Sequence, residues 1–259
     1  MSMLLLTSLG IVVGLLAGLL GIGGGLLMVP LLVAQGYPPL QAIATSSAAI
    51  VLTAISGSLE NWRQGNLAWR SLLGLALPGL FTVQGGVWLA NSISERVLLF
   101  SFALFLLLNV YLMGWSKKIR RGDSPLAASS ALNPWLTQPF FARCLTGGLA
   151  GGLAGLFGIG GGVILVPFQI LLLREPIKKA IQTSLGVIVV TSIASTIGHG
   201  LQGNVLWGIG MALGLGGIVG VQVSTRLLPK LSDSWVNRLF QSVLIVLSVY
   251  TLWRGYHCC

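Results

Sequence analysis

The sequence predicts an all-α polytopic membrane protein made of two inverted-topology repeats, each with four transmembrane helices, one of them broken by glycines. Three observations lead to this fold class: the composition, an internal repeat, and the placement of lysine and arginine. The chain is 54% apolar and only 8% charged, with a mean hydropathy of +0.90, whereas a soluble domain carries about 25% charged residues. Several uncharged runs reach the roughly 20 residues that span a bilayer.

The internal repeat is clearest in two glycine-rich stretches. Residues 16–30 read LAGLLGIGGGLLMVP and residues 153–167 read LAGLFGIGGGVILVP, with eleven of fifteen positions identical. Further matches follow at a nearly constant offset through both halves, which indicates a duplication of the whole unit. The chain therefore divides into a first transmembrane repeat, 1–115, a polar linker, 116–142, and a second transmembrane repeat, 143–259.

Each repeat opens with an apolar run that is interrupted by glycines. Residues 3–35 would form a helix of about 50 Å, too long for one crossing of a core about 30 Å thick. The sequence therefore predicts a helix, a glycine tip and a shorter return, which either crosses the membrane or is re-entrant. The other expected segments of the first repeat are 40–58, 71–90 and 97–115. Those of the second are 144–157, 163–173, 180–198, 205–225 and 235–253.

The basic residues decide how the two repeats are oriented. With four crossings in each repeat, eight lysines and arginines fall on one side and seven on the other. With five segments, the second repeat is inverted, and thirteen fall inside against two outside, Arg96 and Arg254. The positive-inside rule favours the second arrangement, with both termini outside and the linker in the cytoplasm. It also accounts for the net charge of +10, so no nucleic-acid partner is inferred.

The glycine tips are the best candidates for a binding site, because matched helix breaks mark such sites in transporters. They also differ from a dinucleotide or phosphate loop, since they lack its glycine spacing and its lysine. Free N–H groups at the start of each return helix form an anion site, so the two tips would make one anion pocket near the midplane. The tip glycines are Gly21, Gly23, Gly24, Gly25, Gly158, Gly160, Gly161 and Gly162.

Polar residues that recur in both repeats are candidates for further donors to the anion. They are Thr45, Ser46 and Gln84 in the first repeat and Thr183, Ser184 and Gln222 in the second. Such hydroxyls also commonly bond carbonyls of their own helix, and the sequence leaves both interpretations open. Other glycines, such as Gly14 and Gly151, are interpreted as helix-packing positions.

The absent groups narrow the function further. All five acidic residues fall in predicted loops, so no carboxylate relay for protons is expected, and His199 is interpreted as an interfacial residue. No catalytic triad, metal cluster or cofactor motif is found, so an enzyme is not predicted, and the expected partners are a small anion and the lipid bilayer. Without proton coupling, export is favoured over import, because an anion moves outward down the membrane potential.

The duplicated glycine motif, followed in each repeat by a Thr-Ser pair, resembles the TauE/SafE sulfite exporter family. The resemblance implies an inner-membrane secondary transporter of sulfur-containing anions such as sulfite, sulfoacetate or thiosulfate, with the glycine tips lining its path. Three alternatives stay open: an anion channel, an importer on the same scaffold, and an accessory subunit that transports nothing. Flux rate and saturation in liposomes distinguish a carrier from a channel, and an accessory subunit would show no uptake alone and would co-purify with a partner.

Overall fold

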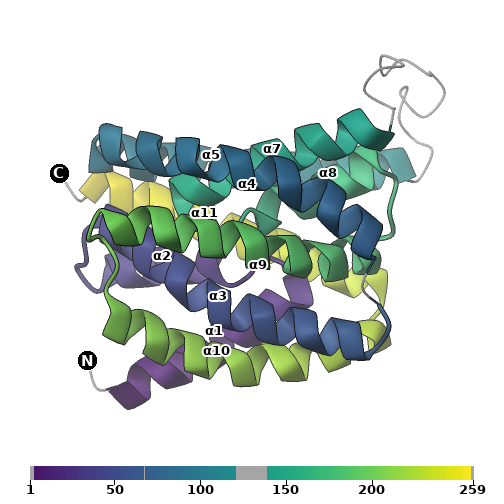
Figure 1. The fold of residues 1–259 in the computed structure, drawn as a ribbon, viewed down its shortest axis with the longest axis horizontal. Coiled ribbons are helices and arrows are strands. Elements are labelled where there is room, and N and C mark those ends of the chain that lie inside the picture. Colours follow the sequence, from purple (N-terminus) through teal and green to yellow (C-terminus); the bar gives the residue numbers. More distant parts are fainter. Residues whose placement is uncertain (1–2, 67, 121–138, 258–259) are drawn as a thin grey trace.

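The computed structural model describes residues 3–66, 68–120 and 139–257, and these are almost entirely helical, with no strand among them (Figure 1). The first repeat contains α1 (Met3–Leu20), α2 (Gly25–Ala34), α3 (Pro39–Arg63), α4 (Trp69–Ser92) and α5 (Glu95–Arg120). The second contains α7 (Pro139–Phe157), α8 (Gly162–Leu172), α9 (Ile177–Leu201), α10 (Trp207–Leu227), a 3₁₀ turn (Leu228–Lys230) and α11 (Asp233–His257). The predicted all-α polytopic fold is confirmed.

Six stretches of the described chain are long and apolar enough to cross a membrane. They are Met3–Leu20, Pro39–Arg63, Trp69–Ser92, Phe140–Phe157, Ile177–Leu201 and Trp207–Lys230. Several helices extend beyond the predicted segments: α5 continues to Arg120 and α7 begins at Pro139, both inside the predicted linker. The rest of that linker, 121–138, lies outside the described residues.

The four helices α10, α3, α9 and α4 run side by side in that order (Figure 1). Helix α1 packs on the outer member α10, and α7 packs on the other outer member α4. The short helices α2 and α8 lie against α3 and α9, and the paired helices α5 and α11 contact α8 and α2 respectively. The first helix of each repeat thus packs on the fourth helix of the other repeat.

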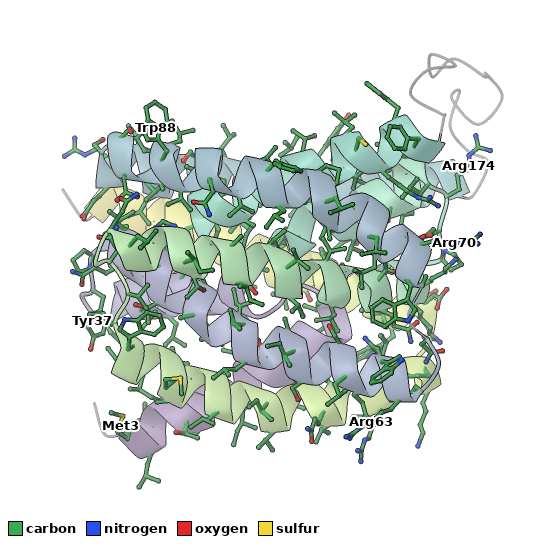
Figure 2. The ribbon with its side chains drawn as sticks, viewed as in Figure 1. Met3, Tyr37, Arg63, Arg70, Trp88 and Arg174 are labelled. Carbon is green, nitrogen blue, oxygen red and sulfur yellow. The ribbon has the colours of Figure 1, made fainter. Side chains whose placement is uncertain are left out.

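The labelled side chains in Figure 2 define two ends of the molecule. Met3, Tyr37 and Trp88 lie at one end, whereas Arg63, Arg70 and Arg174 lie at the other. Helices α1 and α2 therefore form a hairpin that starts and finishes at the Met3 end. Helix α3 runs from the Met3 end to the Arg63 end, and its counterpart α9 runs the opposite way, starting beside Arg174.

Glycines bring α1 against α10 and α7 against α4 at backbone contact. A Cβ atom added to Gly14 would lie 2.7 Å from the Cα atom of Gly217, and one added to Gly151 would lie 2.5 Å from the Cα atom of Gly79. Small residues at such contacts let membrane helices approach closely. The packing interpretation of Gly14 and Gly151 agrees with this geometry.

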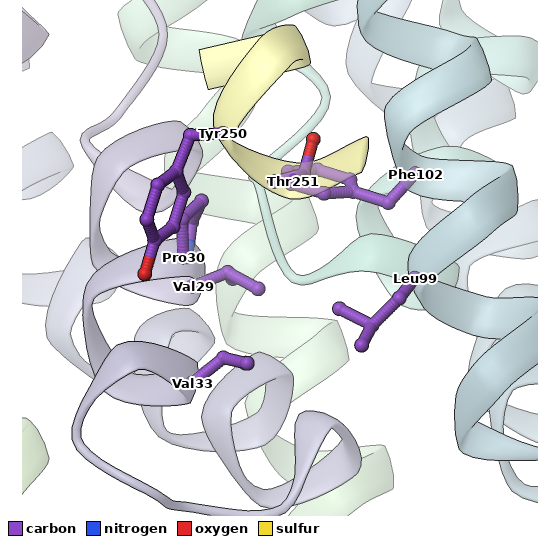
Figure 3. Close-up of a pocket in the computed structure, with 7 residues that line it drawn as sticks. All are labelled: Val29, Pro30, Val33, Leu99, Phe102, Tyr250 and Thr251. Atoms are coloured by element: carbon purple, nitrogen blue, oxygen red, sulfur yellow. The ribbon is translucent and has the colours of Figure 1, made fainter. Parts of the chain in front are cut away.

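The return helix α2 is anchored on the side away from α3 by α5 and α11. The contact leaves a gap of only about 10 Å³ (Figure 3), lined by Val29, Pro30, Val33, Leu99, Phe102, Tyr250 and Thr251. A water molecule needs at least about 10–15 Å³ and several polar partners, so this gap is too small and too apolar to be a path for solute. The packing fixes the position of α2, and with it the position of the glycine tip.

Candidate functional site

Glycines in the left-handed conformation build both helix breaks. In the first break φ is 67° at Gly21, 69° at Gly23 and 91° at Gly24. The second break repeats this pattern, with φ of 63° at Gly158, 69° at Gly160 and 80° at Gly161. Residues with a Cβ atom rarely adopt this region. Gly24 and Gly161 are the N-cap residues of α2 and α8, so the sequence makes the chain turn back at this point in each repeat.

The two tips touch each other at the centre of the fold. A Cβ atom on Gly25 would lie 2.5 Å from the carbonyl oxygen of Gly158, and one on Gly162 would lie 2.7 Å from Cα of Ile22. Gly25 and Gly162 are therefore needed for close approach, not for backbone conformation. No space for an anion separates the tips in this arrangement, so an anion between them requires the tips to move apart.

Hydroxyl groups from α3 and α9 hold four of the tip carbonyls. The Ser46 hydroxyl lies 2.9 Å from the Gly158 carbonyl, and its counterpart on Ser184 lies 2.8 Å from the Gly21 carbonyl. Each hydroxyl shares its one hydrogen with a carbonyl of its own helix, that of Ile43 or Ile181, at 2.9 Å. One or two turns further along each helix, Thr53 donates to Gly23 at 3.1 Å and Thr191 donates to Gly160 at 2.9 Å. All four hydroxyl side chains are buried.

The amide groups of the tips have no such partners. None of the described residues accepts a hydrogen bond from the N–H groups of Gly23, Gly24 and Gly25, or from those of Gly160, Gly161 and Gly162. Each set lies at the N-terminus of a helix, where the helix dipole places partial positive charge. With the carbonyls bonded and the N–H groups free, the centre of the fold carries an excess of hydrogen-bond donors.

The model of the sulfite exporter TauE/SafE family matches residues 6–251, nearly the whole chain. The chain belongs to this family. A probable membrane transporter protein of Xylella fastidiosa (strain Temecula1) is 31% identical over 98% of this chain and 97% of its own length. Another, YunE of Bacillus subtilis, is 27% identical over 98% and 99%. No solved structure matches. This TauE/SafE protein is therefore a multi-pass membrane transporter.

The candidate residues of this TauE/SafE chain do not all meet at the tips. Ser46 and Ser184 do, but the hydroxyl oxygen of Thr45 accepts the N–H of Leu206 at 3.0 Å, at the start of α10. The Thr183 hydroxyl is fully buried and has no partner among the described residues. Gln84 donates to the Ala194 carbonyl of α9 at 3.0 Å, and Gln222 is exposed on α10. Thr45 and both glutamines thus lie apart from the tips.

Thr53 and Thr191 are the site residues that sequence reasoning missed. A signal for them existed, since they occupy equivalent positions in the two repeats. What the sequence could not supply was their position relative to the tips, two turns beyond the Thr-Ser pair.

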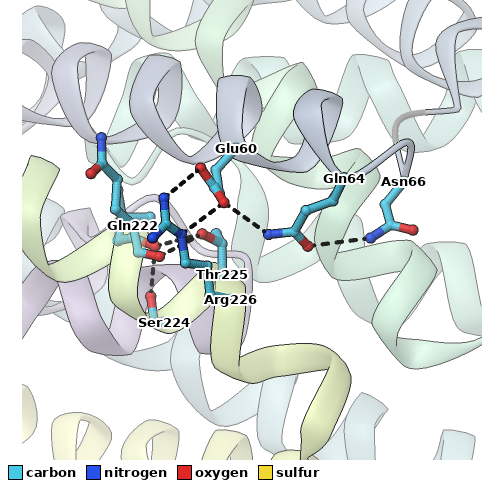
Figure 4. Close-up of polar contacts among 8 residues, drawn as sticks. Glu60, Gln64, Asn66, Gln222, Ser224, Thr225 and Arg226 are labelled. Carbon is cyan, nitrogen blue, oxygen red and sulfur yellow. Dashed lines mark hydrogen bonds and ion pairs between the residues drawn. The ribbon is translucent and has the colours of Figure 1, made fainter.

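The prediction that all acidic residues lie in loops is wrong for Glu60, Glu95 and Asp233. Glu95 and Asp233 occupy the first turns of α5 and α11. Glu60 lies in α3, 8% exposed, because α3 continues five residues past its predicted end and an arginine from α10 meets the carboxylate. Arg226 donates from Nε at 2.9 Å and from a terminal nitrogen at 3.4 Å, and Gln64 donates at 3.2 Å (Figure 4).

The predicted end of the α9 segment, just before His199, is also wrong. Helix α9 extends to Leu201, and the imidazole is fully buried, with Nε2 2.9 Å from the carbonyl oxygen of Gly155 in α7. Among the described residues no group of three or more histidine, cysteine or acidic side chains could hold a metal ion.

Proposed function

We propose that this TauE/SafE protein is a secondary transporter of small sulfur-containing anions, such as sulfite, sulfoacetate or thiosulfate, and that it binds them between the two glycine tips. The observation that carries the proposal is the state of the tip backbone: its carbonyls accept hydroxyl hydrogens while its N–H groups are free. The description of the family as sulfite exporters supports the class of anion.

Electrostatics explain why this arrangement favours an anion. A carbonyl oxygen carries partial negative charge and repels an oxyanion, and a hydroxyl that donates to it reduces that repulsion. The N-terminal ends of α2 and α8 meet at the touching tips, since Gly25 packs on Gly158 and Gly162 packs on Ile22, so each helix contributes partial positive charge there. An oxyanion with several acceptor oxygens can bond both sets of N–H groups at once. A cation or an apolar solute finds no matching partners there.

Entry of the anion requires the tips to separate. Ile50 and Ile188, both fully buried, lie against both tips, since a Cβ atom on Gly23 would lie 3.0 Å and 2.9 Å from them and one on Gly160 would lie 3.4 Å and 2.7 Å from them. The arrangement described above is therefore closed, and the transport cycle opens it from one end at a time. Because α3 and α9 run in opposite directions, the helices of one repeat occupy at one end of the molecule the positions that the helices of the other repeat occupy at the opposite end.

The distribution of charge supports the membrane orientation that the sequence predicts. Arg63, Arg70 and Arg174 lie at one end (Figure 2), and Lys178 reaches the Pro229 carbonyl at 3.0 Å, which places the end of α10 beside the start of α9. We assign this end to the cytoplasm of the inner membrane and the Met3 end, with both termini, to the outside. For an anion that moves without a coupled proton, export follows the membrane potential, at about 2.3 kcal/mol per charge per 100 mV.

Flux of ³⁵S-labelled sulfite and thiosulfate from liposomes tests the proposal. Purified protein should give a saturable flux that sulfate and small sulfonates inhibit to different extents. Thr191→Val keeps the side-chain shape but frees the Gly160 carbonyl, so anion binding should weaken by about 0.5–1.5 kcal/mol, roughly two- to tenfold. The control is Thr251→Val, because the buried Thr251 hydroxyl bonds only carbonyls of its own helix, α11.

Three outcomes would contradict parts of the proposal. Flux that rises linearly with concentration indicates a channel, and no flux above empty liposomes indicates an accessory subunit. Equal affinity in Thr191→Val and the unmutated protein would remove the tips as the binding site while leaving transport itself intact.

A further inference from the structure

Helix α9 carries a stripe of three polar side chains that starts at the second glycine tip. Thr191, Ser195 and His199 are spaced four residues apart, so they lie on one face of the helix. Each bonds the segment formed by α7 and its tip: Thr191 bonds the Gly160 carbonyl at 2.9 Å, Ser195 bonds the Ala154 carbonyl at 3.5 Å, and His199 bonds the Gly155 carbonyl at 2.9 Å. Ser195 also bonds Ser47 of α3 at 3.0 Å.

The imidazole of His199 has one nitrogen available for a proton. A carbonyl oxygen only accepts hydrogen bonds, so Nε2 carries the hydrogen that points at Gly155. In the neutral ring Nδ1 is then an unprotonated acceptor, and it has no partner among the described residues. The side chain is fully buried but lies only two residues before Leu201, which is 85% exposed at the end of α9. His199 therefore lies within one turn of the end of α9.

The equivalent stripe of the first repeat cannot bind a proton in this way. It consists of Thr53, Gly57 and Asn61, so glycine and asparagine replace Ser195 and His199. Asn61 is fully buried too, and neither its amide nitrogen nor its oxygen has a partner within the described chain. At the position equivalent to His199, the fold thus tolerates a buried asparagine side chain without partners.

On the helices that pack against α9, the described charged side chains lie at the other end of the fold, whereas Glu95 and Arg96 lie towards the His199 end but on α5, which does not pack closely against α9. The stripe is two turns long, and His199 meets α7 twelve residues after Arg143, or about 18 Å along the axis. The titratable side chains described on the helices that pack against α9, and on α9 itself, are Glu60, Arg63, Arg70, Arg143, Cys144, Lys178, Lys179, Asp233, Arg238 and Tyr250. Of these only Tyr250 lies towards the same end, and it packs on α2 (Figure 3).

We propose that His199 binds one proton at Nδ1 and that this proton is coupled to the anion held at the glycine tips. This inference rests on the proposed function, and it names the ion that is coupled to the anion. Two steps of four residues separate Thr191 from His199, so at a rise of about 1.5 Å per residue the imidazolium lies about 12 Å along α9 from Thr191. Little water is present in this region to screen the charges. Its positive charge stabilises the bound anion, and by linkage the anion raises the occupancy of the proton site.

The test is the affinity for thiosulfate, whose own charge stays constant between about pH 5 and pH 8, the range in which histidine titrates. The dissociation constant of the unmutated protein should rise several-fold as the pH increases across this range, with a limit of about tenfold per pH unit for one proton. His199→Asn, which installs the residue of the first repeat, should bind thiosulfate with an affinity independent of pH. His257→Gln removes the only other histidine and should keep the dependence.

A second measurement needs no change at position 199. In the His257→Gln protein, ¹⁵N-labelled histidine reports His199 alone, and its resonances should show the Nε2–H form at high pH and a titration that thiosulfate shifts upward. A dissociation constant that does not change with pH, the same pH dependence in His199→Asn, or a titration that thiosulfate leaves unchanged would each overturn the inference. A protein that binds no sulfur anion at any pH would instead overturn the proposed function, and the coupling with it.

Discussion

The serine hydroxyls that bond the tip carbonyls should contribute more to the free energy of unfolding than the hydroxyl of an ordinary buried serine. Replacing Ser184 by alanine leaves the Gly21 carbonyl without its 2.8 Å partner, and no other described residue bonds that oxygen. An orphaned polar group in a buried site costs about 1–3 kcal/mol. Alanine returns a few tenths of a kcal/mol through its higher helix propensity, so a net destabilisation of about 1–2.5 kcal/mol is expected. Ser46→Ala should behave alike, because Ser46 stands in the same relation to Gly158.

A matched control exists in the same chain. Ser248 is also fully buried in a helix, but its hydroxyl bonds the Leu244 carbonyl one turn earlier in α11, and that carbonyl also takes part in the helix. Ser248→Ala should therefore be nearly neutral. Thermal unfolding of purified protein in detergent is the assay, and for a chain of this size 1 kcal/mol corresponds to about 2–4 °C. Equal midpoints for Ser184→Ala and Ser248→Ala would show that the tip carbonyls do not depend on these hydroxyls.

Two further predictions concern helix packing and topology. Gly151→Ala should lower the unfolding midpoint by the equivalent of about 1–3 kcal/mol, because the added Cβ atom would collide with Gly79. The control is Gly152→Ala on the same helix, whose Cβ atom would meet only Thr82 at 3.9 Å or more, so it should be neutral or stabilising. Similar midpoints for the two variants would contradict the backbone contact of α7 with α4. In a chain without Cys144, Cys258 and Cys259, an impermeant thiol reagent added outside should label a cysteine at the exposed Gln202 and spare one at the exposed Ser232; the reverse labelling would reject the assigned orientation.

Most of the fold could be predicted because membrane constraints act on the sequence directly. Spans must be apolar and of fixed length, so runs such as 3–20 were located to the residue, and glycines mark where the helices turn back. Segment ends were less accurate: the structure extends α3 from a predicted end at 58 to Arg63 and α9 from 198 to Leu201. Both extensions contain an ionisable residue, Glu60 or His199, and a prediction from hydropathy ends a segment before such a residue.

The wrong predictions for Glu60 and His199 both arise because an ionisable residue lies inside a helix. A charged residue can lie in a helix and be largely buried when a partner neutralises it, and the partner of Glu60 is 166 residues away in α10. No periodicity relates Glu60 to Arg226, since the pair has no equivalent in the other repeat. His199 is buried because a carbonyl of α7 faces it, which is a tertiary contact. Thr53 and Thr191 show the converse: their recurrence was visible, but their contact with the tips depends on how α3 and α9 cross.

The positions at which the two repeats differ determine how the two ends of the molecule differ. Identical inverted repeats would pack identically at both ends, so any difference in stability or chemistry between the ends must come from residues without an equivalent. Among the polar residues that differ, Glu60 and Arg226 at the Arg63 end correspond to Gly198 and Trp88 at the Met3 end, while Ser47, Ser195 and His199 correspond to Leu185, Gly57 and Asn61. One end is thus closed by an ion pair between α3 and α10, and the other contains buried hydroxyls and an imidazole. The symmetric tips supply a shared centre, and the two ends that lead to it differ in charge and in buried polar groups.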